Sequence, residues 1–295
     1  MAETQELAGV EISNPDKILF PKSGITKLHL AQYYVEVAEY MLPHLHNRPI
    51  SMQRFPNGIA KPGFYQKERS EHFPKFVKPV RVKLKTEGSK TYVLVHNEQT
   101  LAFLANQGNI PIHIWLSQKG NINKPNKIIW DLDPTDADFE KVREGAFLLR
   151  DFFKECAGIE PFIKTTGSRG LHIVIPIKAE NSFTKVRNTA KKLADALAKK
   201  HPELFTTEML KKERGKNVFV DYLRNGFAQT AVAPYSVRPK EGAPVAMPIH
   251  WEQLENNEFN SQSYTIKNAI KHLEKTGDIW KDMYSKPYDL KDLHI

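Results

Sequence analysis

From residue 127 onward the sequence alternates between apolar strand-like segments and amphipathic helical segments, and this alternation constrains the fold most. The expected strands cover residues 128–133, 161–164, 171–177, 218–223 and 228–233, and the expected helices cover residues 139–157 and 182–200. The second helix has its apolar residues on one face, and Pro202 lies just past its end. Such an alternation is typical of a helix-covered sheet of the α/β or α+β class.

The first 126 residues follow a different pattern. Thr26 is placed to cap a helix that continues to Met41 and stops near Pro43. Residues 56–90 are rich in Lys, Arg, Pro and Phe, which predicts surface loops with little regular structure and a surface suited to nucleic acid. Further strand-like runs lie at 49–55, 92–95 and 112–116, and a further helical run lies at 99–107.

Charge and cysteine content narrow the class of protein. The 295 residues carry a formal net charge of +9, which favours a polyanionic partner. The single cysteine, Cys156, excludes disulfides and thiolate zinc sites. The polar amino terminus does not resemble a secretory signal, and no run approaches the ~18 apolar residues that cross a bilayer. We therefore expect a cytoplasmic protein with no membrane partner.

Two aspartates stand in an otherwise apolar segment, residues 128–134. Side chains at positions i and i+2 of a strand point to one face, so Asp131 and Asp133 project together. Their repulsion in a partly buried strand would raise one pKa, and a divalent cation between them removes that conflict. Carboxylate oxygens suit magnesium or manganese rather than zinc. The alternative is a solvated strand end, because Asp before Pro is common in turns.

A third aspartate, Asp221, lies inside another apolar segment, residues 217–223. Together with Asp131 and Asp133 it gives the three carboxylates that a two-metal site for phosphoryl or nucleotidyl transfer needs, with ions about 4 Å apart. The sequence therefore predicts these three residues as the catalytic metal ligands.

Residues 164–175 form a hydroxyl- and glycine-containing turn that leads into a strand. The glycines let backbone amides approach an anion, and the hydroxyls of Thr166 and Ser168 can donate hydrogen bonds. Arg169 and His172 add charge-assisted donors. The spacing is not that of a P-loop. We interpret the turn as a cradle for a triphosphate.

Three motifs follow one another along the chain: Asp131-Leu132-Asp133-Pro134, Ser168-Arg169-Gly170-Leu171-His172 and Val220-Asp221-Tyr222-Leu223-Arg224-Asn225. Their order and spacing resemble those of the archaeo-eukaryotic primase superfamily, and closely those of the polymerase domain of bacterial ligase D, which works in nonhomologous end joining. The resemblance extends to residues 14–21, 48–58, 64–67 and 233–238. The family usually has serine at Thr166 and often lysine at Arg169, so hydroxyl and charge are kept.

The resemblance implies a role for each matching residue. Asp131 and Asp133 would bind both metal ions, Mn²⁺ or Mg²⁺, and Asp221 would complete the ion that activates the primer's 3′ hydroxyl. The residues implied to hold the nucleoside triphosphate are His113, Thr166, Ser168, Arg169, His172, Arg224 and Arg238. The residues implied to bind DNA are Lys17, Lys27, Arg54, Phe64, Tyr65 and Lys67. Among the latter, Lys17 and Lys27 would grip a 5′ phosphate, and Phe64 or Tyr65 would stack on a template base.

The resemblance also implies a fold and a function. The fold would be an RRM-like catalytic sheet intertwined with an N-terminal α/β module, in one primase-polymerase domain over residues 1–295. Residues 1–126 would form the DNA-binding module and residues 127–295 the catalytic one. The function would be template-dependent primer extension with ribo- or deoxyribonucleotides at gaps and double-strand breaks with 5′-phosphate ends. The implied partners are Ku and a DNA ligase, near the nucleoid. The chain has no room for ligase or phosphoesterase domains, so we expect a stand-alone polymerase or an excised domain.

Two alternatives stay open. Residues 131–135 also fit the nucleophile motif of haloacid dehalogenase-type phosphatases, in which Asp131 would attack phosphorus, although no late paired-aspartate loop is found. A non-catalytic DNA-end-binding module would use Lys17, Lys27, Arg54 and Lys67 and show salt-sensitive binding without nucleotide incorporation.

Overall fold

The computed structural model describes residues 4–84 and 88–293. The chain divides into two compact units, each assembled from separate stretches of sequence. The first unit contains residues 1–119, 230–247 and 264–278, and the second contains residues 120–229, 248–263 and 279–295. Two segments from the later half of the sequence therefore belong to the first unit.

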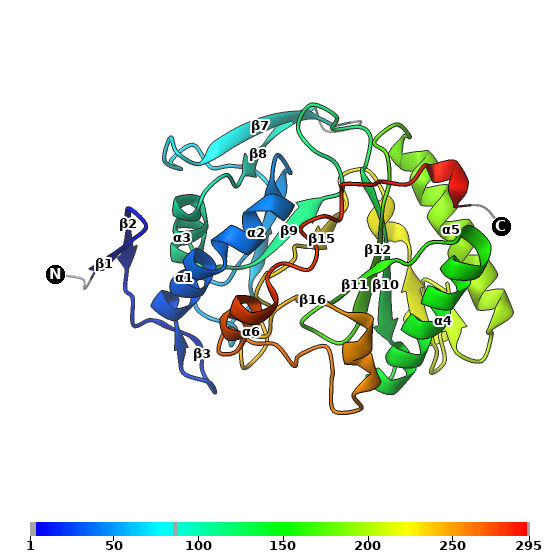
Figure 1. Ribbon diagram of the computed structural model, residues 1–295. Helices are drawn as coiled ribbons and strands as arrows, with labels where there is room; N and C mark the ends of the chain where they lie inside the picture. The colour runs from blue at the N-terminus through cyan, green and yellow to red at the C-terminus, as the bar shows by residue number, and fades with distance from the viewer. Residues whose placement is uncertain (1–3, 85–87, 294–295) are drawn as a thin grey trace. The chain divides into compact units, whose positions relative to one another are not determined.

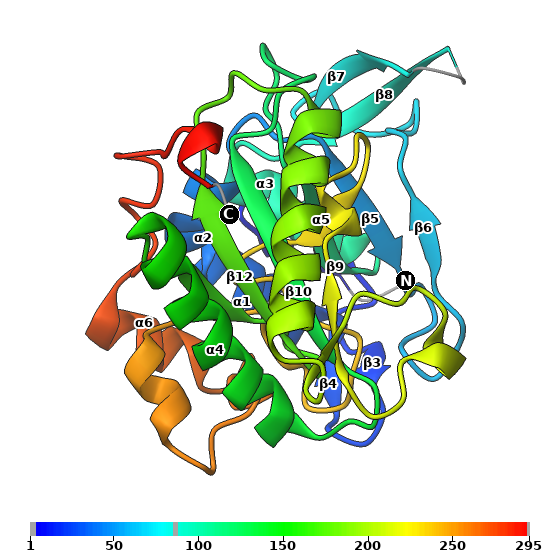
Figure 2. The same cartoon turned by 90° about the vertical axis from the view of Figure 1, so that its right-hand side faces the viewer.

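The first unit is built on an antiparallel sheet in the order β15-β9-β5-β8-β7, and β6 pairs with β5 (Figures 1 and 2). The strands of this sheet are β5 (Ile50–Arg54), β6 (Phe64–Gln66), β7 (Lys78–Lys83), β8 (Ser89–Leu94), β9 (Asn109–Trp115) and β15 (Thr230–Val232). The helices are α1 (Lys27–Glu36), α2 (Ala38–Leu45), α3 (Glu98–Asn106) and α6 (Ala269–Thr276). Two small hairpins pair β1 (Thr4–Leu7) with β2 (Val10–Ser13) and β3 (Ile18–Phe20) with β4 (Ile25–Thr26).

The predicted cap of the first helix is confirmed, but its predicted length is wrong. The Thr26 hydroxyl accepts a hydrogen bond from the His29 N–H at 3.3 Å, and the His29 side chain accepts one from the Thr26 N–H. The expected single helix to Met41 is interrupted at Val37, where α1 ends and α2 follows. Pro43 lies inside α2 and does not stop it at once; it removes one helical N–H donor, and the helix ends two residues later.

Two further expectations are wrong: the loops expected over residues 56–90, and the sheet to which the strand expected at 228–233 belongs. Residues 56–90 are not only loops, because they contain β6, β7 and the start of β8. In β7 the side chains of Val80 and Val82 are buried while their neighbours are exposed, a two-residue period that the basic, proline-rich composition obscured. The strand expected at 228–233 is β15, which pairs with β9 of the first unit and not with the later strands.

The second unit has its sheet in the order β13-β14-β10-β12-β11-β16. Its strands are β10 (Lys127–Pro134), β11 (Phe162–Thr165), β12 (Leu171–Pro176), β13 (Phe205–Thr206), β14 (Val218–Asp221) and β16 (Pro248–Ile249). The two predicted long helices are present as α4 (Phe139–Ala157) and α5 (Phe183–Lys200), and they lie side by side on one face of this sheet (Figures 1 and 2). Short 3₁₀ helices occur at Lys211–Glu213, Leu223–Asn225, Trp251–Glu255 and Leu290–Asp292.

Trp130 shows which face of β10 meets the helices. Its indole N–H donates to the Ala190 carbonyl of α5 at 3.0 Å, and its ring lies 4.7 Å from the ring of Phe153 on α4. Alternation along the strand therefore turns Asp131 and Asp133 to the opposite face. Within the described part of the chain, no helix has both the length and the apolarity needed to span a membrane.

Candidate active site

Four ionisable residues form one row across the second sheet. Asp131 on β10 stands opposite Asp221 on β14 and opposite His172 on β12. His172 in turn stands opposite Lys164 on β11. Directly opposed residues of antiparallel strands project to the same face. The row Asp221, Asp131, His172, Lys164 therefore lies on the face of the sheet that α4 and α5 do not cover.

Charged contacts join the carboxylates of this row to their neighbours. Asp131 Oδ2 lies 3.4 Å from His172 Nε2 and 3.5 Å from Arg224 Nη2. Arg224 Nε lies 3.6 Å from Asp221 Oδ2, so this guanidinium group lies near both aspartates. Asp221 Oδ1 also accepts a hydrogen bond from the Leu223 N–H at 2.7 Å, which holds its side chain against the chain turn after β14.

Asp133, the second aspartate of β10, is paired with the phosphate-cradle turn. Arg169 Nη2 lies 3.1 Å from Asp133 Oδ2, and both side chains are more than a third exposed. Two predicted groups of residues, the metal ligands and the phosphate cradle, therefore meet at this ion pair.

The three carboxyl groups differ in pKa, because their surroundings differ. Burial opposes ionisation of Asp131, but attraction from His172, Arg224 and Lys164 outweighs it and places the pKa of Asp131 well below its usual range. Burial, followed by repulsion from Asp131, raises the pKa of Asp133 and of Asp221.

Burial, and then Lys164, lower the pKa of His172 to about 4, against the opposing attraction of Asp131. The imidazole is therefore neutral at pH 7 and pairs with Asp131 as a hydrogen-bond donor. Arg224 and Lys164 are then the cations that favour ionised Asp131 at neutral pH.

The Thr166 hydroxyl organises the turn between β11 and β12. It donates to the Gly170 carbonyl at 3.0 Å and accepts from the backbone N–H groups of Ser168 and Gly170. Ser261 also donates to the Gly170 carbonyl, at 2.8 Å. Thr166 is 5% exposed, so its hydroxyl shapes the cradle from inside.

Gly170 sets how closely this turn approaches the carboxylate strand. A Cβ at this position would lie 1.9 Å from the Leu132 carbonyl oxygen, which sits between the two aspartates of β10. Only glycine permits that approach.

Two residues of the site were not predicted from the sequence. Asn225 is fully buried; its Oδ1 accepts from the Ile129 N–H at 2.9 Å, and its Nδ2 donates to the Ile129 carbonyl at 2.7 Å. The Asn225 side chain thus continues the hydrogen bonding of β10 beyond the point where the pairing of β10 with β14 ends. Lys164 is 2% exposed and completes the row. An amide at the end of the third motif and a lysine before the cradle were the only sequence signals.

The first unit carries the predicted DNA-contacting aromatic residues on β6. Phe64 and Tyr65 are 47% and 59% exposed, although both are large and apolar. Tyr65 lies 6.0 Å from the ring of His113, and the Arg54 guanidinium lies 5.6 Å from the centre of the Phe64 ring. Arg54 also donates to Gln66 and Gln107, so it supports the strand; Lys67, just after β6, is exposed.

The two lysines predicted to grip a 5′ phosphate lie near each other in the same unit. Lys27 is 7% exposed, and its Nζ donates to the Ser13 carbonyl at 2.5 Å. Burial and then repulsion from Lys17 lower the pKa of Lys27. Lys17 is exposed and donates to Asn57. Arg238 also belongs to the first unit, where its backbone N–H donates to the Pro244 carbonyl.

The carboxylates fit divalent cations by donor type. No three His, Cys, Asp or Glu side chains among residues 4–84 and 88–293 are arranged as a ready-made metal site, since each carboxylate faces a cation or a backbone N–H. Carboxylate oxygens on one sheet face nevertheless suit hard ions such as Mg²⁺. The buried Nδ1 of His172 has no hydrogen-bond partner in the described chain, which leaves a polar atom for a substrate.

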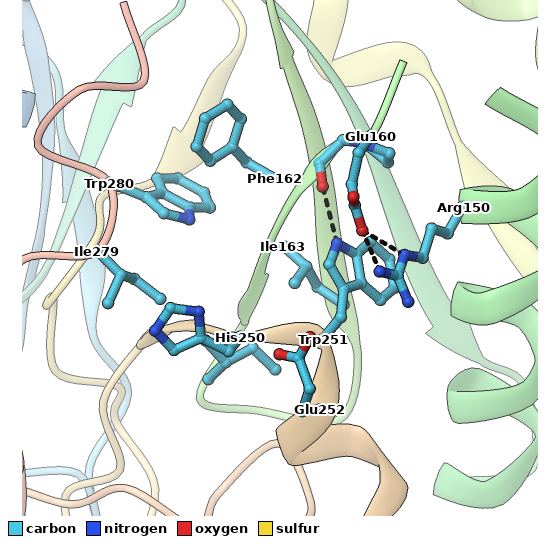
Figure 3. Close-up of a pocket in the computed structure, with 11 residues that line it drawn as sticks. Arg150, Glu160, Phe162, Ile163, His250, Trp251, Glu252, Ile279 and Trp280 are labelled. Atoms are coloured by element: carbon cyan, nitrogen blue, oxygen red, sulfur yellow. Dashed lines mark hydrogen bonds and ion pairs between the residues drawn. The ribbon is translucent and has the colours of Figure 1, made fainter. Parts of the chain in front are cut away.

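A separate pocket of about 360 Å³ lies at the β16 edge of the second sheet (Figure 3). Trp280, Ile279 and His250 lie on one side of it, and Arg150 and Glu160, joined by an ion pair, lie on the other. None of the predicted site residues lines this pocket.

Comparisons with known proteins agree with the geometry. A family model described as the LigD primase-polymerase domain matches residues 26–280. The multifunctional non-homologous end joining protein LigD of Mycolicibacterium smegmatis is 30% identical over 92% of this chain, and the bifunctional LigD of Bacillus subtilis is 31% identical over 95%. The chain spans only 35% and 45% of these two relatives.

A solved structure is similar over nearly the whole chain. The polymerase domain of Mycobacterium tuberculosis ligase D in complex with DNA superposes with a TM-score of 0.87 and 29% identity, covering 94% of this chain and 99% of that one. The predicted mixed α and β fold is confirmed by this match. The chain therefore belongs to the LigD primase-polymerase domain family.

Proposed function

We propose that this chain extends a primer on a DNA template by transferring a nucleotide from a nucleoside triphosphate to the primer's 3′ hydroxyl. The observation that carries the proposal is the row of Asp221, Asp131 and His172 across three strands, with Asp133 on the same face beside the cradle turn. Membership of a primase-polymerase family supports this chemistry, and the similar ligase D domain was solved with DNA.

In this proposal Asp131, Asp133 and Asp221 hold two divalent ions, Mg²⁺ or Mn²⁺. Such ions would lower the pKa of the attacking hydroxyl and stabilise the leaving pyrophosphate. The low pKa of Asp131 keeps that ligand ionised at any physiological pH. Metal ions would compete with Arg169 and Arg224 for these carboxylates, and the two displaced guanidinium groups would then be free to bind the triphosphate.

The remaining cradle groups hold the nucleotide. The backbone of the turn, shaped by Thr166, presents Ser168 and Arg169 beside the carboxylates, and His172 offers its unpaired ring nitrogen. His113 and Arg238 of the first unit are proposed to contact the nucleotide as well.

The first unit is proposed to bind the DNA. Phe64 and Tyr65 offer exposed rings on which a template base can stack. Lys17 and Lys27 place two nearby positive charges where a single 5′ phosphate would relieve their mutual repulsion. Arg54 and Lys67 flank the aromatic strand. A role in nonhomologous end joining, with Ku and a DNA ligase as partners, follows from the relatives' names and the family resemblance.

Primer extension on gapped DNA tests the proposal. The wild-type chain is expected to add nucleotides opposite the template in the presence of Mn²⁺ or Mg²⁺, and to do so better when the gap carries a 5′ phosphate. Parallel reactions with ribo- and deoxyribonucleotides measure sugar preference. Asp133→Asn should abolish extension while DNA binding persists, and Asp151→Asn, at an exposed aspartate of α4, is the control. Extension by the Asp133 variant at the wild-type rate would overturn the assignment.

The two alternatives have different standing. The phosphatase alternative is wrong, because the chain belongs to a polymerase-domain family. The non-catalytic alternative makes a distinct experimental prediction, namely salt-sensitive DNA binding with no incorporation by the wild-type chain.

A further inference from the structure

Lys164 is a buried cation at the end of the carboxylate row. Its side chain is 2% exposed, and its Nζ donates to the Thr165 carbonyl at 3.4 Å among other interactions. Burial of an ammonium group carries a large desolvation penalty, and apolar residues of similar volume often serve the fold as well or better. Its position opposite His172, the neighbour of Asp131, suggests a role in the reaction.

The cations near the row differ in their freedom to move. Arg169 pairs with Asp133, Arg224 lies near both Asp131 and Asp221, and Lys164 stands at the end of the row, opposite His172. The two arginine side chains are 41% and 42% exposed, so they can turn from a carboxylate to a triphosphate. Lys164 is enclosed by the sheet and stays in place. It stands two strands from Asp131 in the same row, so its charge acts on the centre of the site.

We propose that Lys164 is a positioning residue whose fixed positive charge makes the site favour a divalent ion that arrives with a triphosphate over the free ion. The proposal rests on the proposed function and deepens it. A fixed cation repels a free divalent ion and attracts the negative charges of a triphosphate. The metal–nucleotide complex combines a divalent ion with the negative charges of a triphosphate, so the charged site is expected to bind it in preference to the free ion.

Opposite changes in two affinities are the signature of this role. Lys164 lies two strands from Asp131, about 10 Å at the usual strand spacing. Removing a unit charge at that distance should change the affinity for a divalent ion by roughly fourfold, and more for a ligand of higher charge. Lys164→Met is therefore expected to bind free Mn²⁺ about fourfold more tightly, and to bind ATP in EDTA more weakly by at least about the same factor. A purely structural lysine would change both affinities in the same direction.

The experiment measures Mn²⁺ binding by electron paramagnetic resonance without nucleotide, and ATP binding in EDTA by calorimetry. Lys164→Arg keeps the charge and should restore both affinities. Lys199→Met is the control for net charge, because Lys199 is an exposed lysine near the end of α5, on the side of the sheet away from the row. Thermal unfolding should show Lys164→Met to be at least as stable as wild type, and Lys164→Gln is a second neutral variant if the methionine chain does not fold.

The outcomes separate the two proposals. Tighter Mn²⁺ binding with weaker ATP binding in the neutral variants, and wild-type values in Lys164→Arg and Lys199→Met, would support the role of Lys164. Unchanged affinities, or a loss of both, would overturn it. Failure of the wild-type chain to extend a primer would overturn the proposed function alone, because both affinities are measured without DNA.

Discussion

At the residue scale, ionisation of the three carboxylates affects the stability of the fold in different ways. Asp131 is stabilised as an anion by its neighbours, whereas burial and the repulsion of Asp131 disfavour the charge on Asp221. A raised pKa in the folded state means that ionisation destabilises the fold at pH 7. This penalty shrinks as the pH falls from the folded-state pKa and is gone only below the lower unfolded-state pKa. This penalty fits the proposed role of Asp221 as a metal ligand, because the residue does not serve the stability of the fold at pH 7.

Asp221→Asn is expected to raise the melting temperature at pH 7 by a few degrees and to abolish primer extension. The amide oxygen can still accept from the Leu223 N–H, so the local turn is kept. The gain should shrink toward zero in acid, where the wild-type carboxyl is protonated. Thermal unfolding between pH 4 and pH 8 measures this, with Asp151→Asn as the control. A variant that is less stable than wild type at pH 7 would contradict the argument.

Gly170→Ala should be among the most damaging single changes at the site. The added methyl group would meet the Leu132 carbonyl oxygen, which is part of a central strand and cannot move cheaply. We expect a loss of roughly 2–4 kcal/mol in the free energy of unfolding, together with loss of extension. Gly158→Ala, at a left-handed residue with open space around it, should cost only about 1 kcal/mol. Urea denaturation compares the two, and equal losses would count against the close-approach explanation.

The residues that the sequence predicted at this site are those whose signal is local. The spacing of Asp131 and Asp133 is a strand period, and Asp221 stands out as one acid in an apolar run. The importance of Lys164 and the ion pair of Arg224 with Asp131 depend on strand register. That register joins segments far apart in the sequence, and no local pattern encodes it.

At the element scale, the bounds expected for the two long helices, 139–157 and 182–200, match α4 and α5 to within one residue, whereas the end expected for the first helix is wrong. The ends of the long helices are set by short local signals. Asp138 and Ser182 cap α4 and α5, and Gly158, in the left-handed conformation, ends α4. The two short strands β7 and β15 were missed or misassigned. In β7 the basic, proline-rich composition favoured a loop prediction over the alternating burial pattern of a strand. In β15 three residues contain no signal for the sheet that the strand joins.

Asn225 supports the central strand, and its loss should weaken that element. Asn225→Ala removes both hydrogen bonds to Ile129 and leaves a buried N–H and a buried carbonyl without those partners. We expect a loss of about 3 kcal/mol in the free energy of unfolding. Amide hydrogen exchange should show reduced protection at Ile129 and Asp131 in particular. A stability change without a local change in exchange at β10 would contradict this role.

At the scale of the whole molecule, the sequence pattern did not predict which segments belong to each unit. The expected modules were contiguous, with a boundary between residues 126 and 127. The chain instead returns to the first unit at residues 230–247 and 264–278. Contacts between residues more than a hundred positions apart, such as β15 with β9, decide this division. Only the family resemblance anticipated that the modules intertwine.

The net charge of +9 belongs to this scale as well, and it predicts salt-dependent DNA binding in which single lysines have separable effects. Lys17→Ala should reduce affinity for gapped DNA with a 5′ phosphate by about tenfold, since one charge-assisted contact is lost. It should leave affinity for the 5′-hydroxyl substrate nearly unchanged. Lys17 suits this test better than Lys27, because it is exposed while Lys27 also holds Ser13 in place.

Fluorescence anisotropy over a range of NaCl concentrations measures the effect. With the 5′-phosphate substrate, the slope of log affinity against log salt should fall by about one in Lys17→Ala. Lys199→Ala, at an exposed lysine near the end of α5, removes the same net charge and should leave the preference for a 5′ phosphate intact. Equal losses in the two variants would mean that only the total charge matters. A loss confined to Lys17→Ala would locate the 5′-phosphate contact in the first unit.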